Sequence, residues 1–175
     1  MSGSLIKLDE EIVSSSVASV QLGASNWDSS YDVYVVKISD LHMDASASVY
    51  ARVLVSGTAD TSANYCSSGK NLRADQAFDN QAETNATQIN EIILSSDDGV
   101  TGSAGNGIHY LFSFNNASEF SYISFENTTV RANSKLMGKQ GSAVSKVTQA
   151  CNGIEYTGNG QNITGGRFSL YALHK

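Results

Sequence analysis

Proline is absent from this chain of 175 residues, and charged residues make up only 16% of it. Turns must therefore be built from glycine, asparagine, aspartate and serine, and no native cis-proline can slow folding. Serine, threonine, asparagine and glycine fill the charge deficit, which gives the polar but weakly charged composition common in β-rich surface proteins. Intrinsic disorder requires high net charge and few β-branched or aromatic residues, so the composition indicates a folded domain.

Clusters of basic residues are also missing. The net charge is −6, and lysine and arginine are scattered singly, as at Lys37, Arg52 and Arg131. A domain that binds nucleic acid normally carries a basic patch, which releases counterions from the phosphates. We therefore expect no nucleic-acid partner and no attachment to an anionic membrane.

Long apolar segments are lacking as well. No run approaches the roughly 20 residues of a transmembrane helix, and Met1-Ser2-Gly3-Ser4 has neither the basic nor the apolar region of a signal peptide. We expect a soluble protein made in a cytoplasm. Cys66 and Cys151 are the only cysteines. An extracellular protein would pair them in a disulfide, whereas a cytoplasmic one favours two reduced thiols, which is our expectation.

Period-two alternation of apolar and polar residues recurs along the chain, and sustained helical periodicity almost nowhere. The strongest predicted strand covers residues 31–38, which are apolar on both faces from Val33 onward, so we expect it to be central and covered on both sides. Residues 108–114 and 120–126 predict a hairpin. In all, about eight to ten short strands predict an all-β fold, a single antiparallel β-sandwich of jelly-roll-like form. We expect one domain over residues 1–175, with a short N-terminal arm.

Three further expectations concern the less regular stretches. Gly57 to Ala86 is polar and without clear periodicity, which predicts a long loop that is functional or crosses between sheets. Residues 143–151 fit one short helix. The last two predicted strands, 153–157 and 167–173, are expected to pair with each other.

Motifs for catalysis and cofactors are not found. There is no G-x-S-x-G elbow, and His42, His109 and His174 lie in unrelated contexts. Asp40, His42 and Asp44 alternate at the end of a predicted strand, where they would share one face as metal ligands do, but we interpret them as a polar strand end that faces water. We expect no enzyme, no cofactor and no metal.

Several segments resemble small structural proteins of tailed phages, especially phages of marine and freshwater cyanobacteria. The resemblance spans the chain, is blurred between Gly57 and Ala86, and is carried by these segments: Ser4-Leu5-Ile6-Lys7-Leu8-Asp9, Tyr31-Asp32-Val33-Tyr34-Val35-Val36, Tyr110-Leu111-Phe112-Ser113-Phe114-Asn115-Asn116-Ala117-Ser118, Gly153-Ile154-Glu155-Tyr156 and Gly165-Gly166-Arg167-Phe168-Ser169-Leu170-Tyr171. It implies a jelly-roll-like virion building block of the capsid or the tail, without catalytic residues.

On this basis we expect a capsid decoration (cement) protein on the outside of the virion. It would bind the major capsid protein and form a homotrimer at the three-fold positions of the lattice. Leu5, Ile6 and Tyr171 are the expected interface residues. The alternative is a tail or fibre protein that binds a host surface glycan through Trp27 and the Gly57 to Ala86 loop. Trp27 fits equally well as a plug at the edge of the core.

Overall fold

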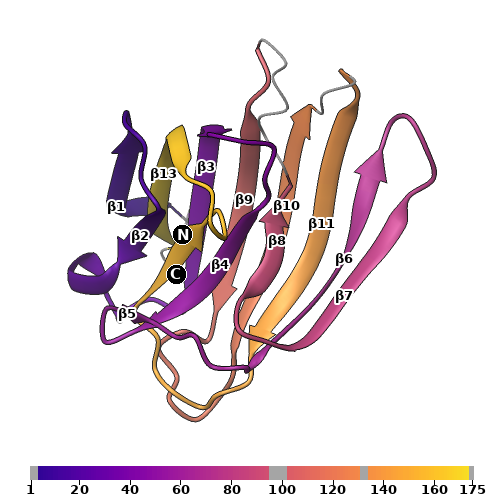
Figure 1. Ribbon diagram of the computed structural model, residues 1–175. Helices are drawn as coiled ribbons and strands as arrows, with labels where there is room; N and C mark the ends of the chain where they lie inside the picture. Colours follow the sequence, from indigo (N-terminus) through magenta and orange to yellow (C-terminus); the bar gives the residue numbers. More distant parts are fainter. Residues whose placement is uncertain (1–3, 95–101, 131–133, 174–175) are drawn as a thin grey trace.

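The computed structural model describes residues 4–94, 102–130 and 134–173 (Figure 1). Apart from one 3-10 turn, η1 (Ala24–Asn26), all of its regular elements are strands. Their bounds are β1 (Leu5–Val13), β2 (Ser19–Gly23), β3 (Val33–Met43), β4 (Val49–Val55), β5 (Thr58–Ala59), β6 (Tyr65–Arg73), β7 (Asp79–Ala86), β8 (Ile89–Ile93), β9 (Gly105–Phe112), β10 (Ser121–Val130), β11 (Leu136–Ser145), β12 (Gly153–Thr157) and β13 (Ile163–Leu173).

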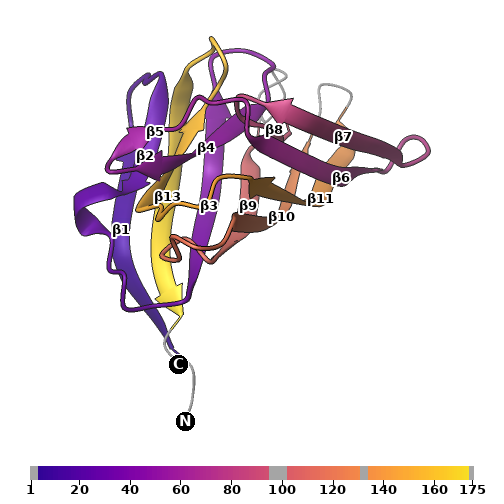
Figure 2. The ribbon, with the colours of Figure 1, turned by 90° about the horizontal axis from the view of Figure 1, so that it is seen from below.

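The strands form two antiparallel sheets. The large sheet has eight strands in the order β1-β13-β3-β9-β10-β11-β6-β7, and the small sheet has the order β2-β12-β4-β5, with β8 also paired to β4. The large sheet curves around the small one (Figure 2). The expected fold class, an all-β antiparallel sandwich, is confirmed.

One hydrophobic core fills the space between the sheets. Alternation builds it, because every second side chain of a strand points to the same face. In β9 and β10 the inward residues Leu111, Ile123 and Phe125 are buried, whereas their neighbours along the strand are exposed or half-buried. The small sheet contributes Val53, Ile154 and other side chains to the same core.

The prediction of a loop over residues 57–86 is wrong. The stretch contains β5 and the hairpin of β6 and β7, which forms one edge of the large sheet. Sequence periodicity missed these strands because polar residues occupy both of their faces. β7, for example, reads DNQAETNA and buries none of its side chains fully.

Two other expectations also fail. Residues 143–145 end strand β11 instead of beginning a helix. β12 and β13 do not pair, because the intervening segment crosses between sheets: β12 lies between β2 and β4, and β13 between β1 and β3. The hairpin predicted over residues 108–126 is present as β9 and β10.

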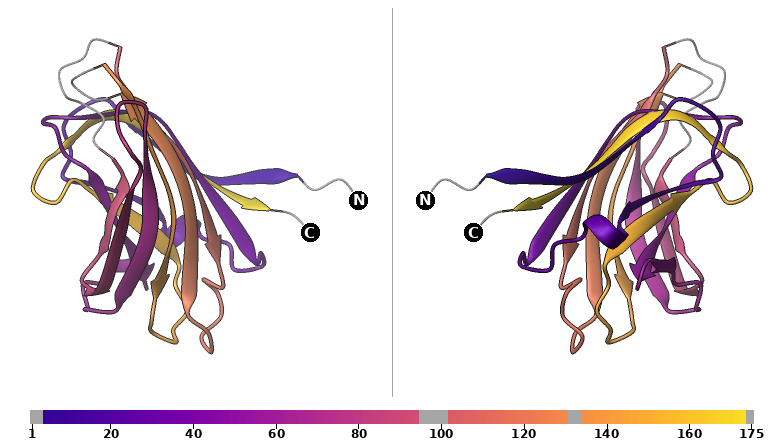
Figure 3. Two further views of the ribbon diagram at one scale, coloured as in Figure 1. Left: turned by 90° about the vertical axis from the view of Figure 1, so that its right-hand side faces the viewer. Right: turned by 90° about the vertical axis from the view of Figure 1, so that its left-hand side faces the viewer.

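At one end of the molecule, β1 and β13 extend away from the sandwich as a ribbon (Figure 3). Leu5 pairs with Leu173 and Lys7 with Tyr171 along this ribbon. Within the described ranges, no helix has the length and apolar character needed to cross a membrane.

Candidate functional site: the outer face of the large sheet

The outer face of the large sheet, which points away from the small sheet, carries a continuous apolar surface. On β9 the exposed fractions are 43% for Ile108, 43% for Tyr110 and 37% for Phe112, and Tyr122 of β10 is 48% exposed. We call the following set the outer apolar face: Leu5, Val33, Val35, Ile108, Tyr110, Phe112, Tyr122, Tyr171 and Leu173.

Strand register makes this surface continuous. Phe112 lies opposite Val33 on one side and Tyr122 on the other. In the next row Val35 lies between Tyr171 and Tyr110. Directly opposite residues of an antiparallel pair have Cβ atoms about 4.5–5.5 Å apart, close enough for side chains to touch. Val35 is only 7% exposed, although it points outward, because its neighbours cover it.

This surface corrects the expectation that residues 31–38 form a strand covered on both sides. β3 is the third strand of the large sheet, and only its inner face packs on the core. Its outward side chains are Val33, Val35 and the exposed Lys37. The strand is apolar on both faces because its outer face belongs to the outer apolar face.

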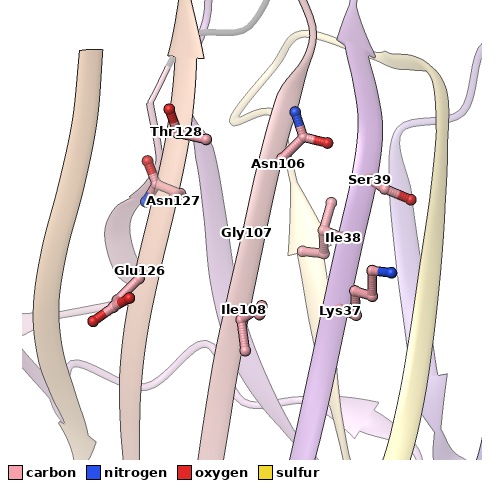
Figure 4. A pocket seen from close by; sticks show the side chains of 9 residues that line it. All are labelled: Lys37, Ile38, Ser39, Asn106, Gly107, Ile108, Glu126, Asn127 and Thr128. Atoms are coloured by element: carbon pink, nitrogen blue, oxygen red, sulfur yellow. The ribbon is translucent and has the colours of Figure 1, made fainter. Parts of the chain in front are cut away.

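A shallow hollow of about 360 Å³ adjoins the aromatic side chains on the same face. Figure 4 shows the residues around it, which come from β3, β9 and β10. Ile108 lies in register between Lys37 and Glu126, and Asn106 and Thr128 continue the lining along the strands. The hollow therefore offers one cation, one carboxylate and uncharged hydrogen-bonding groups around the apolar side chain of Ile108, two residues before Tyr110 on β9. The rings of Tyr110 and Phe112 are nearly parallel, at an angle of 21°, with centroids 6.4 Å apart.

The most strongly perturbed titratable groups lie inside the sandwich, not on this face. His109 is fully buried, and its Nδ1 lies 2.8 Å from the hydroxyl of Tyr156. Burial lowers the pKa of His109 to about 3 and raises the pKa of Tyr156. Neither group is accessible from solvent, so we assign this hydrogen-bonded pair to the packing of the core and not to a binding site.

The three predicted interface residues lie together on the projecting ribbon. Ile6 pairs with Ala172, one step from the Leu5–Leu173 and Lys7–Tyr171 pairs. Leu5 is 54% exposed, and Ile6 and Tyr171 are half-buried. Leu5 and Tyr171 point to the outer side of the sheet, and Ile6, between Leu5 and Lys7, points to the other side. Their role as an interface stays a prediction, and sequence reasoning did not name Tyr110, Phe112 or Tyr122 for it. The alternation in residues 108–112 was the signal that pointed to them.

Trp27 lies at the edge of the core. Its Nε1 donates to Oδ1 of Asn115 at 2.7 Å, and its ring stacks on Tyr34 with centroids 3.8 Å apart. The other half of the predicted glycan site, residues 57–86, includes β6 and β7 at the opposite edge of the large sheet from β1 (Figure 1). Only the start of this stretch lies near the Trp27 segment, since a Cβ at Gly57 would be 3.8 Å from Cβ of Ala24. Glycan contact by Trp27 stays a prediction.

The remaining candidates have ordinary partners. Nε2 of His42 lies 3.2 Å from Oδ1 of Asp40, and Oδ1 of Asp44 accepts from the backbone of Asn162. No three His, Cys, Asp or Glu side chains within the described ranges form a metal-binding group. Both thiols are free: Cys151 is buried, and Cys66 is half-buried on β6.

Comparison of the chain with protein-family models, with curated proteins and with solved structures finds no match.

Proposed function

We propose that the protein is a non-enzymatic structural protein of a phage virion, a capsid decoration protein that attaches to the coat-protein shell. The observation that carries the proposal is the outer apolar face. It crosses β1, β13, β3, β9 and β10 and includes the ribbon residues Leu5 and Tyr171. Contiguous exposed apolar surface of this kind is typical of protein interaction sites.

The chemistry of this face suits a protein partner. Aromatic side chains are enriched at the centres of protein interfaces, and Tyr110, Phe112 and Tyr122 lie where several strands meet. A homotrimer at the three-fold positions, which the phage resemblance implies, would let one such patch serve every copy.

The first experiment is the copy number per virion, measured by quantitative mass spectrometry of purified particles. A decoration protein is present in numbers comparable with the major coat protein. Absence from particles would contradict the virion assignment, and a small multiple of the tail symmetry would move the protein to the tail.

A second experiment tests the face itself, by co-sedimentation with capsids that lack the protein. The double variant Tyr110→Ser/Tyr122→Ser is expected to lose binding, with a fall in affinity of at least tenfold. Phe78→Ser is the matched control, because it removes an equally exposed ring (56%) from the turn between β6 and β7. Equal binding by the double variant and the control would contradict the assignment of the face.

A second candidate function is glycan binding by a tail or fibre protein. The observation in its favour is the row of exposed rings beside a hollow that Lys37, Asn106 and Glu126 line. Sugars stack on aromatic rings and bind neighbouring polar groups. On a glycan array, a decoration protein gives no signal. A glycan binder gives a signal that Tyr110→Ala removes and that Trp27→Ala removes only if the indole takes part.

A further inference from the structure

Lys139 is the least exposed lysine, arginine, aspartate or glutamate in the described part of the chain, at 3%. It lies on β11 and points to the inner side of the large sheet, beside the ring of Phe125, whose centroid is 5.9 Å from its Nζ. Burial lowers the pKa of its ammonium, although the charges of Glu91, Asp79 and Glu83 oppose this. Lys139 therefore loses its proton and forms the neutral amine more readily than a lysine in water does.

A glycine in the next strand opens a path for this side chain. Gly69 of β6 pairs with Gly141 of β11. A Cβ at Gly69 would lie 3.3 Å from Cε of Lys139 and 2.9 Å from the carbonyl oxygen of Gln140. Because Gly69 has no side chain, Lys139 crosses over β6 and reaches β7.

At the end of this path the amine meets a carboxamide and a carboxyl group. Nζ of Lys139 donates to Oε1 of Gln81 on β7, and Nε2 of Gln81 donates to Oε2 of Glu91 on β8. Nζ also lies 2.9 Å from the carbonyl oxygen of Glu91 and 3.5 Å from that of Asn90. Glu91 has a φ of 50°, a left-handed conformation that is uncommon outside glycine and often marks a functional constraint.

We propose that Lys139 and Gln81 join in an intramolecular isopeptide bond between β11 and β7, with Glu91 as the proton carrier. Loss of one proton leaves Nζ with two N–H groups, which can keep the carbonyl oxygens of Asn90 and Glu91 as acceptors. The lone pair then replaces the third N–H group, which donates to the Gln81 carboxamide in the ammonium form. The three groups are held on three strands of a folded sandwich, and such positioning provides effective molarities of about 10⁵–10⁸ M.

The reaction balances without any co-reactant. The Nζ lone pair of Lys139 forms a bond to Cδ of Gln81, and the bond from Cδ to Nε2 breaks. The Glu91 carboxylate accepts a proton from Nζ and passes it to Nε2, which leaves as ammonia. The products are one secondary amide and one molecule of ammonia, and nothing is oxidised or reduced.

The bond has a structural consequence that does not depend on the proposed function. β7 is an edge strand and pairs only with β6 among the described strands. A covalent link from β11 across β6 would fix this edge of the large sheet, whose side chains are mostly polar and bury little apolar surface.

Mass spectrometry of the intact, full-length protein tests the proposal. The wild-type chain is expected to be lighter than its sequence mass by one ammonia molecule, whereas Lys139→Arg, Gln81→Ala and Glu91→Gln keep the full sequence mass. Full mass in the wild-type chain overturns the proposal, whether or not the variants fold.

Peptide mapping of the denatured wild-type chain locates the change. Acylated Lys139 is no longer a trypsin site, so we expect a branched peptide that joins the segments containing residues 81 and 139. Lys146 is the matched control, because its Nζ lies 2.7 Å from Oδ1 of Asn85 on the same edge strand but is exposed. Trypsin is expected to cleave after Lys146. Cyclisation at an asparagine, as in Asn152-Gly153, would also release one ammonia molecule. It would leave trypsin cleavage after Lys139 intact. A mass loss of one ammonia together with normal cleavage after Lys139 therefore overturns the proposal.

Discussion

Asn115 joins the loop that carries Trp27 to the beginning of β3. Its Oδ1 accepts from Nε1 of Trp27, and its Nδ2 donates to the carbonyl oxygen of Tyr31 at 2.5 Å and to the hydroxyl of Tyr34 at 2.6 Å. One amide thus satisfies both the indole N–H and a backbone carbonyl in a partly buried position. Polar groups in such positions are costly when they are left without a partner.

Asn115→Ala is expected to lower the free energy of unfolding by about 1–3 kcal/mol, because the truncation removes the acceptor of the Trp27 indole N–H. Urea denaturation followed by tryptophan fluorescence measures the loss. Asn116→Ala is the control, since Asn116 is exposed and its Oδ1 accepts only the backbone N–H of Ser118 in a local turn. Similar losses in both variants would contradict the role given to Asn115.

His109 makes stability depend on pH. Its pKa is lowered by burial from 6.5 to about 3, so the native state keeps a neutral imidazole while the unfolded chain takes up a proton. The free energy of unfolding therefore falls as the pH falls from about 6.5 towards 3, and it is unaffected by this group above that range.

Between neutral pH and about pH 4.5, the wild-type chain should lose about 2–3 kcal/mol more stability than His109→Gln, which cannot titrate. Urea unfolding of both proteins at the two pH values gives the difference. A parallel decline in the two proteins would show that the imidazole takes up its proton without unfolding.

Gly69 and Gly141, which lie opposite each other on β6 and β11, allow these two strands to approach closely near the β7 edge of the large sheet. Gly141 of β11 is the more crowded, because a Cβ there would lie 2.5 Å from the carbonyl oxygen of Ser68 and 2.7 Å from Cζ of Phe125. Contacts this short require the backbone of β6 and the core ring to move. A substitution at Gly141 therefore disturbs the packing of β6 against β11, and not only residue 141 itself.

Gly141→Ala is therefore expected to destabilise the protein by about 3 kcal/mol, the upper end of the range for overpacked cores. Ser142→Ala, at the next and exposed position of β11, should change the melting temperature little. Thermal unfolding of the two variants checks this, and equal melting temperatures would mean that the sheet yields more easily than its packing indicates.

Sequence patterns predicted strands well where one face is buried and the other is exposed to solvent. Alternation located β9 and β10, and the β-branched run around Val36 located β3. Patterns failed for β6 and β7, because polar side chains such as Asn71 of β6 and Gln81 of β7 lie on the inner side there as well. The cluster of Lys139, Gln81 and Glu91 could not be predicted, since three separate strands supply it and only the strand order brings them together.

At the scale of the whole molecule, the salt dependence of capsid binding distinguishes attraction through charges, of which the chain carries a net −6, from docking through the outer apolar face. Exposed charges are screened at high ionic strength, whereas apolar contacts are not weakened. Capsid binding is expected to stay within about threefold of its initial affinity when NaCl is raised to roughly 1 M. Co-sedimentation across a salt series measures this, and a fall of a hundredfold would assign binding to charged groups instead of the outer apolar face.

The position of β13 between β1 and β3 also determines when, during synthesis, this part of the large sheet can form. β1 and β3 are among the first strands to leave a ribosome, and β13 is the last strand of the described chain. Until it arrives, β1 has no sheet partner and one edge of β3 is open to any other chain. Pairings between distant parts of a sequence also form slowly. A nascent copy thus passes a period in which it can add a strand from a neighbour, and dilution or a chaperone during synthesis should raise the yield of correctly closed sheets.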